Sequence, residues 1–177
     1  MVFSKTVIAA AVALGLGGAG LAIQQGVLPI PGTRADRADQ AAPAGSVAVT
    51  IAAAGGRHRF VVELAATPAA QEKGLMYRTD LTPTGGMLFW PYPAAGGGPR
   101  EASFWMKNTP TPLDIIFIRA DGTIARIAEN TVPFSEAPVA SGEPVDAVLE
   151  IVGGRAAELG IGEGDRVTWS KAPAPAR

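Results

Sequence analysis

Short stretches in which apolar residues alternate with small or polar ones run along this chain, and glycine- and proline-rich turns separate them. Apolar side chains alternate over residues 47–51 and again over residues 60–64, on either side of the pair Gly55-Gly56. A period of two on both sides of such a pair is typical of a β-hairpin. No segment shows the amphipathic helix of roughly 10–15 residues that a parallel crossover usually needs. The pattern therefore predicts a mainly β domain without a parallel sheet.

Two short helices and several further strands are expected. Thr67 can cap a helix that starts at Pro68 and ends at Gly74, because its hydroxyl accepts an N–H of the first turn and proline is tolerated there. The pair Gly153-Gly154 opens a second brief helix, which Gly160 ends. Strands are predicted over residues 87–90, 103–107, 113–119, 123–128, 145–152 and 166–170. Turn signals about 8–12 residues apart favour a compact β-sandwich or jelly-roll-like domain, and a small, partly open β-barrel is the alternative.

The N-terminal segment has one basic residue, Lys5, followed by an uncharged and mostly apolar run from Thr6 to Ile23. This is the pattern of a secretory signal. The run is also about as long as the roughly 18 residues of a membrane-spanning candidate, so an uncleaved anchor stays open. We expect a signal peptide or anchor at residues 1–23, a flexible linker at 24–45, the folded domain at 46–170 and a disordered tail at 171–177. The predicted location is the periplasm or the extracellular space, with the membrane contacted only through the N-terminal segment.

Cysteine and histidine usage excludes several kinds of chemistry. The chain has no cysteine and a single histidine, His58. A thiol nucleophile, a disulfide, a thiolate zinc site and an Fe–S cluster are therefore excluded, as is a His–His metal pair. The formal net charge of −1 disfavours nucleic acid as a partner. Methionine is a soft ligand for Cu(I), but Met76, Met87 and Met106 are more simply core residues, so we expect no metal and no cofactor.

Several unusual sequence words follow one another in a fixed order. They are Gly74-Leu-Met76-Tyr-Arg78, Gly86-Met-Leu-Phe89, Phe104-Trp-Met-Lys107-Asn-Thr109-Pro110, Pro112-Leu-Asp114-Ile-Ile-Phe117 and Val148-Leu-Glu150. Together they resemble the DUF192 family of uncharacterised bacterial and archaeal proteins, over roughly residues 60–169. The resemblance implies a compact β-rich domain of jelly-roll type that is often exported. It implies no established activity.

The word Phe104-Trp105-Met106-Lys107 is the densest candidate for a binding site. In a strand, alternate residues face opposite sides, so Phe104 and Met106 would fill the core while Trp105 and Lys107 face outward. An exposed indole beside an ammonium group can stack on a sugar ring or hold an anionic group. The simpler alternative is that Trp105 packs under the neighbouring loop and that Lys107 pairs with an acid.

Asp114 precedes a run of residues that must be largely buried, so its carboxylate needs a partner or backbone N–H donors. Lys107 and Arg78 are the nearest candidate cations, and Thr109 could add a hydroxyl. A structural ion pair or a turn-forming hydrogen bond would equally explain Asp114. We expect any ligand near Arg78, Trp105, Lys107, Thr109 and Asp114, roofed by the glycine-rich loop at residues 91–99.

The chain shows no nucleophile elbow, no phosphate loop and no cluster of metal ligands. We therefore predict no catalytic residue and favour a non-catalytic binding or interaction module of the cell envelope, for a carbohydrate or a small anionic ligand. A carboxylate-based hydrolase of envelope glycan is one alternative, since paired acids suffice for that reaction. Its acids would come from Asp114, Glu129, Asp146 and Glu150. A purely structural or partner-binding protein is the other alternative.

Overall fold

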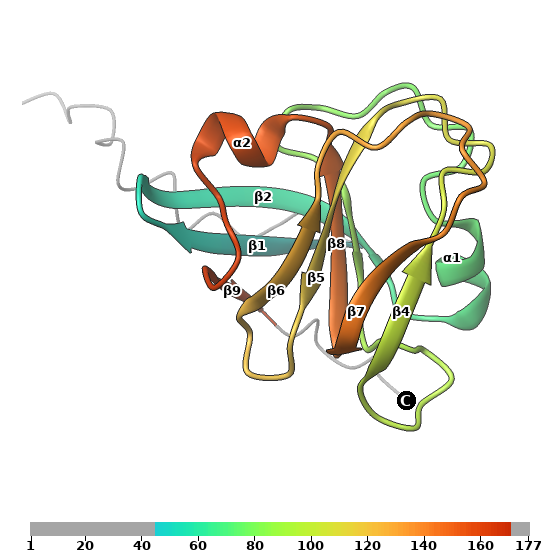
Figure 1. Ribbon diagram of the computed structural model, residues 1–177, viewed down its shortest axis with the longest axis horizontal. Helices are drawn as coiled ribbons and strands as arrows, with labels where there is room; N and C mark the ends of the chain where they lie inside the picture. Colours follow the sequence, from blue (N-terminus) through green and yellow to red (C-terminus); the bar gives the residue numbers. More distant parts are fainter. Residues whose placement is uncertain (1–44, 171–177) are drawn as a thin grey trace, which may run out of the picture.

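The structure is a computed structural model, and it describes residues 45–170. The predicted leader and tail, and nearly all of the predicted linker, lie outside the described residues. Within them the elements are β1 (Ser46–Ala53), β2 (Gly56–Ala65), α1 (Pro68–Lys73), β3 (Met87–Phe89), β4 (Arg100–Phe104), β5 (Leu113–Ile118), β6 (Ile124–Ala128), β7 (Val139–Val145), β8 (Ala147–Val152), α2 (Arg155–Leu159) and β9 (Arg166–Trp169) (Figure 1).

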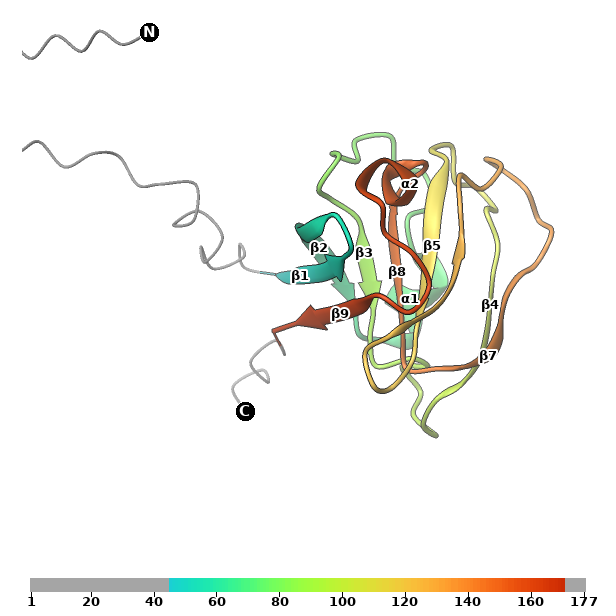
Figure 2. The ribbon, with the colours of Figure 1, turned by 60° about the vertical axis from the view of Figure 1, so that its left-hand side comes forward.

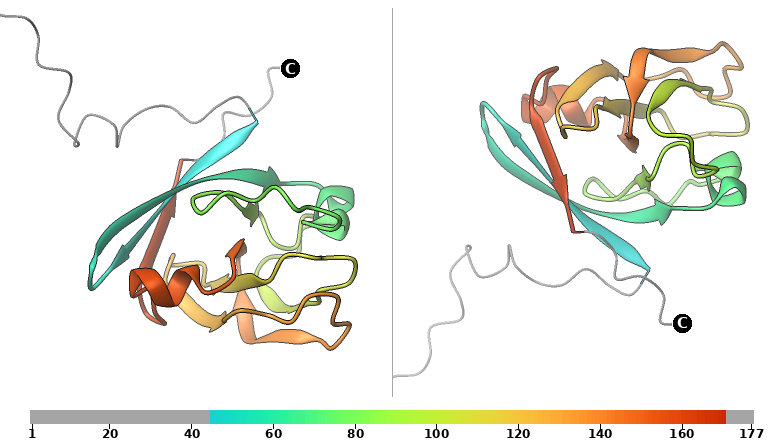
Figure 3. Two further views of the ribbon diagram at one scale, coloured as in Figure 1. Left: turned by 90° about the horizontal axis from the view of Figure 1, so that it is seen from above. Right: turned by 90° about the horizontal axis from the view of Figure 1, so that it is seen from below.

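The larger sheet has the strand order β6-β5-β8-β3-β2-β1-β9. It curls until its two edge strands approach each other, as the views along the vertical axis show (Figure 3). An isolated bridge joins Thr123 to Arg166, and Val167 N–H donates to Gly122 O at 2.8 Å. The described domain is thus mainly β, as the alternation of the sequence predicted. Its curled, half-barrel sheet is consistent with the expected β-sandwich and with the alternative of a partly open barrel.

A second layer, made of β4 and β7, covers part of the outer face of this sheet (Figure 2). The domain consequently has two apolar clusters. One fills the inside of the curled sheet and includes Phe60, Leu149 and Ile151. The other lies between the outer face of the sheet and the second layer and includes Phe117 and Val148. Neighbouring residues of β8 therefore serve different clusters.

The local signals near the helix ends and the first turn are confirmed. Strands β1 and β2 pair antiparallel, with Ala53 opposite Gly56 at the turn. The Thr67 hydroxyl accepts a hydrogen bond from Ala70 N–H at 3.2 Å, and the N–H of Gly74 closes α1 on the carbonyl of Ala70. These contacts join groups a few residues apart, so a single sequence contains all the information they need.

The domain was predicted to have no parallel sheet, and one pair among the described strands departs from the antiparallel pattern. Strands β2 and β3 pair in parallel, with Leu64 opposite Leu88. Their connection, residues 66–86, contains only the one short helix α1 and loops back beside the sheet. A connection between parallel strands must be long enough to return to the same end of the sheet, but it need not contain a long helix. This connection is long enough.

One predicted strand is also displaced, and one strand was missed. The strand expected at 103–107 is β4, which ends at Phe104; the strand expected at 145–152 is β8, and β7, just before it, was not predicted. Gly142 and Pro144 hid β7, because they read as turn residues. In the structure Gly142 has a φ of 77° and the β4–β7 register shifts between Glu101 and Ser103, so the turn signal marked a β-bulge.

Candidate functional site

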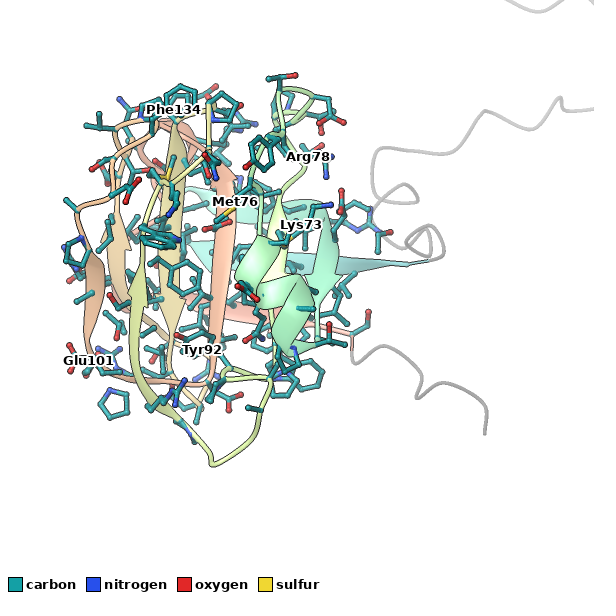
Figure 4. The ribbon with its side chains drawn as sticks, turned by 90° about the vertical axis from the view of Figure 1, so that its right-hand side faces the viewer. Lys73, Met76, Arg78, Tyr92, Glu101 and Phe134 are labelled. Carbon is teal, nitrogen blue, oxygen red and sulfur yellow. The ribbon has the colours of Figure 1, made fainter. Side chains whose placement is uncertain are left out.

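A pocket of about 290 Å³ lies between α1 and the end of β4, on the outer face of the curled sheet. Its walls come from residues 71–76 on one side and from residues 103–105 and Lys107 on the other. Phe89, Tyr92, Thr109 and Glu150 complete the lining. Figure 4 shows α1, with Lys73, beside β4 and Tyr92 on this face of the molecule.

Glu150 is the one lining carboxyl group that is buried, with 4% of the residue exposed. It lies on β8 and projects to the outer side of the sheet, whereas its neighbours Leu149 and Ile151 enter the inner cluster. Within residues 45–170 its side chain has no hydrogen-bond or ion-pair partner. Burial raises the pKa of Glu150 to about 8. At neutral pH the group is therefore mostly a neutral acid, which donates one hydrogen bond and still accepts others.

Trp105 and Lys107, two of the candidate ligand residues, both line this pocket. Trp105 is 46% exposed while Met106 is 1% exposed, although the chain is no longer in a strand at these positions. The N–H of Met106 donates to Ser135 O at 2.8 Å, which fixes the segment that follows β4. Lys107 Nζ lies 4.9 Å from the centre of the Trp105 ring, a cation–π contact. Lys107 is thus held near the indole and not by Asp114.

Thr109 contributes to the pocket mainly by stabilising the turn at residues 106–109. Thr109 is 5% exposed and lines the pocket. Its Oγ1 donates a hydrogen bond to Lys107 O at 3.1 Å, and its N–H donates to Met106 O at 3.0 Å. The turn between these residues places Lys107 and Thr109 on the same wall.

Arg78 does not line this pocket, although the sequence placed it among the candidate ligand residues. Its Nε donates to Asp80 Oδ1 at 2.6 Å and its Nη1 to Glu63 Oε1 at 2.6 Å. The hydrogen bonds from Arg78 lower the pKa of Asp80 below its usual value. The described contacts of this side chain join β2 to the loop that follows α1.

Asp114 is fully buried and binds the backbone. Its carboxylate accepts the N–H of Asn130 at 2.7 Å, of Gly154 at 2.8 Å and of Ala156 at 2.7 Å. Buried carboxylates need such donors, and these three lie on segments far apart in the sequence. The alternative of a structural hydrogen-bonding role therefore describes what Asp114 does here.

Asp114 and Glu150 lie on opposite faces of the sheet. Ile115 of β5 is directly opposite Glu150 of β8 and shares its face, so the preceding residue, Asp114, points to the other side. Of the other two candidate acids, Glu129 is exposed, and Asp146 accepts the Trp90 indole N–H at 3.2 Å. None of Asp114, Glu129 and Asp146 lines the pocket with Glu150.

The glycine-rich loop at residues 91–99 contributes one side chain to the pocket, that of Tyr92. Gln71 of α1 ties this loop to the helix: its Nε2 donates to Pro91 O at 2.8 Å and its Oε1 accepts Ala94 N–H at 3.0 Å. Sequence reasoning missed Gln71 and Tyr92, and it considered Glu150 only as half of an acid pair. The signal that could have identified Glu150 is a lone carboxyl in an otherwise apolar strand.

No group of three or more His, Asp or Glu side chains within residues 45–170 could hold a metal ion. Neither of the helices in this range is long and apolar enough to cross a membrane. Met87 and Met106 are buried in the outer apolar cluster, in agreement with their interpretation as core residues, whereas Met76 is half-buried and lines the pocket.

Two solved structures resemble the chain over most of its length. A protein of unknown function from Novosphingobium aromaticivorans is 46% identical with a TM-score of 0.69, and the match covers 78% of this chain and 99% of that one. A protein from Sinorhizobium meliloti, described as a candidate transcription regulator, is 44% identical with a TM-score of 0.65; the match covers 73% of this chain and 97% of that one. No curated protein matches the chain.

The sequence model of DUF192, described as "Uncharacterized ACR", matches residues 49–169. The match runs from β1 to β9 and so includes nearly the whole described domain, together with the pocket and Glu150. The resemblance that the separated sequence words indicated is confirmed. The chain belongs to the DUF192 family.

Proposed function

We propose that the domain is a non-catalytic binding module whose pocket takes a saccharide. The observation that carries the proposal is Glu150, a buried carboxyl without a partner among the described residues that lines a pocket. An unsatisfied buried polar group is costly, and a ligand hydroxyl would give it a hydrogen-bond partner. As a neutral acid it can both donate to and accept from such a hydroxyl.

The remaining lining fits a sugar in size and in chemistry. The pocket volume of about 290 Å³ lies at the lower end of the roughly 300–1,000 Å³ of small-molecule sites. Trp105 and Tyr92 offer aromatic surfaces for the apolar face of a ring. Ser103 offers a polar group, while Lys73 and Lys107 could bind an acidic substituent. This combination supports a saccharide over a purely apolar ligand.

Replacement of Trp105 by alanine is expected to abolish most of the signal on a glycan array, because the stacking surface is lost. Glu150→Gln is expected to weaken binding less, since the amide keeps two polar atoms at the same place. Glu163→Ala, an exposed residue that does not line the pocket, is the matched control. Equal signals from wild type, Trp105→Ala and Glu163→Ala would reject the saccharide.

One observation supports a second candidate, a hydrolase of envelope glycan. A buried carboxyl that stays protonated near neutral pH is the state that a general acid needs. Glu72 also lines the pocket and is the second carboxyl group there. Slow turnover of a bound glycan that Glu150→Gln abolishes, while binding persists, would favour the hydrolase over the binding module.

We further propose that the domain acts outside the cytoplasm, since the uncharged run from Thr6 to Ile23 follows a single basic residue. Fractionation of the native host is expected to place the protein in the periplasm, the membrane or the medium. Mass spectrometry of the same sample distinguishes a cleaved leader from an anchor. Full-length protein found only in the cytosol would contradict export.

A further inference from the structure

Two aromatic side chains near the pocket project into solvent. Tyr77 is 71% exposed and Phe134 is 63% exposed. Both have left-handed backbone conformations, with φ of 64° and 60°. Bulky residues rarely adopt this conformation, which glycine adopts without penalty. Neither position therefore uses the residue type that would suit its backbone best.

Both aromatic residues are bonded to the segment that forms a wall of the pocket. Tyr77 N–H donates to Asn108 O at 2.7 Å, and Phe134 N–H donates to Thr109 O at 3.2 Å. Thr109 and its neighbour Lys107 line the pocket. Tyr77 and Phe134 thus flank one short stretch of chain, and their backbones are held in place beside the site.

The pocket also continues toward these residues. A shallower hollow of about 420 Å³ is lined in part by Met76 and Asn108, the residues next to Tyr77 in the chain and in the hydrogen-bond pattern. Glu72, Lys73, Met76, Trp105 and Lys107 line both hollows, so the two are continuous. Figure 4 places Phe134 near one end of this face and Tyr92 further along it, with Met76 and Lys73 between them.

We infer that the site takes a linear oligosaccharide and not a single sugar. This inference rests on the proposed function and extends it to the length of the ligand. One sugar unit occupies the pocket at Glu150, and the following units cross the hollow beside Met76 and reach the rings of Tyr77 and Phe134. Aromatic faces bind successive sugar rings by the same stacking that Trp105 offers in the pocket.

The test measures affinity against ligand length by calorimetry on the full chain. The probes are N-acetylglucosamine and glucose, each as the monomer and as β-1,4-linked oligomers up to the hexamer. For at least one series we expect the affinity to rise tenfold or more from monomer to tetramer. In Tyr77→Gly and Phe134→Gly this increase is expected to be lost, while the affinity for the monomer stays unchanged.

Glycine is chosen because it suits the left-handed backbone at both positions, so these variants should unfold at the same temperature as wild type or higher. Val132→Ala is the matched control, because Val132 is an exposed residue without an aromatic ring in the segment before Phe134. This variant should leave the affinity for every oligomer unchanged. A merely structural role for Tyr77 and Phe134 would instead lower stability and monomer affinity together.

The possible failures are distinguishable. Equal affinity for monomers and oligomers, or an unchanged length dependence in the glycine variants, overturns the inference but leaves the saccharide site. If no member of either series binds, both the inference and the proposed function fail. Length-dependent binding of extended peptides in place of glycans would likewise overturn both and identify the occupant as a peptide.

Discussion

Replacement of Asp114 by alanine is expected to destabilise the domain by about 3–5 kcal/mol, which would leave a small domain close to unfolding. The carboxylate accepts three backbone N–H groups, and its residue is fully buried. Alanine removes all three acceptors at once, and a buried donor without a partner costs about 1–3 kcal/mol. The loss would loosen the contact between β5 and the start of α2, because two of the donors are Gly154 and Ala156.

Chemical unfolding monitored by tryptophan fluorescence measures this effect. Asp114→Asn keeps one acceptor oxygen but adds an N–H₂ group among donors, so its loss should be smaller than that of alanine and still clear. Asp80→Ala is the matched control, because Asp80 is an exposed carboxylate whose pair with Arg78 contributes less than about 1 kcal/mol. If Asp114→Ala and Asp80→Ala were equally stable, Asp114 would not be the structural anchor that its contacts indicate.

Glu150→Gln is expected to change how the stability depends on pH. The folded state holds the pKa of Glu150 at about 8, against an ordinary value of 4.5. Between these values the native state binds a proton that the unfolded chain has released, so the free energy of unfolding falls as pH rises. One such group gives a slope of about 1.4 kcal/mol per pH unit. The glutamine side chain cannot ionise and lacks this slope.

Near pH 4 we expect wild type and Glu150→Gln to have similar free energies of unfolding. At pH 8 the free energy of unfolding of the variant should be higher by an amount on the order of 4 kcal/mol. Unfolding curves of both proteins across this range give the difference directly, because every other ionisable group is shared. Parallel pH profiles would show that Glu150 is ionised in the native state. A bound saccharide should reduce the difference in stability, since it gives the carboxyl group a partner.

Sequence reasoning succeeded wherever the deciding contacts are local. The hairpin at Gly55-Gly56 and the cap at Thr67 depend on residues within one turn, and both are present. The exposure of Trp105 and the burial of Met106 followed from apolar patterning, even though the strand ends before them. The DUF192 motifs could also be recognised from the sequence, because a family match needs only the order of residues.

The candidate site residues show the same distinction between local contacts and contacts with distant segments. Trp105, Lys107 and Thr109 are close in sequence and line one pocket. Arg78 and Asp114 also belong to the family sequence motifs, but neither lines the pocket. Arg78 forms ion pairs with Glu63 and Asp80, and Asp114 accepts hydrogen bonds from backbone N–H groups. The sequence placed all five residues at one candidate site, and only their contacts in the folded chain separate them.

The sequence by itself determined that this chain is a β-rich domain of a known family, where its turns and short helices lie, and which segment carries exposed aromatic and basic side chains. The tertiary structure alone decided that β2 and β3 pair in parallel, that Asp114 and Glu150 face opposite sides of the sheet, and that Glu150 enters a pocket walled by α1 and the end of β4. The physical reason is that a strand fixes only the alternation of its side chains. Which face is covered, and by what, depends on strands and helices that are distant in sequence and adjacent only after folding.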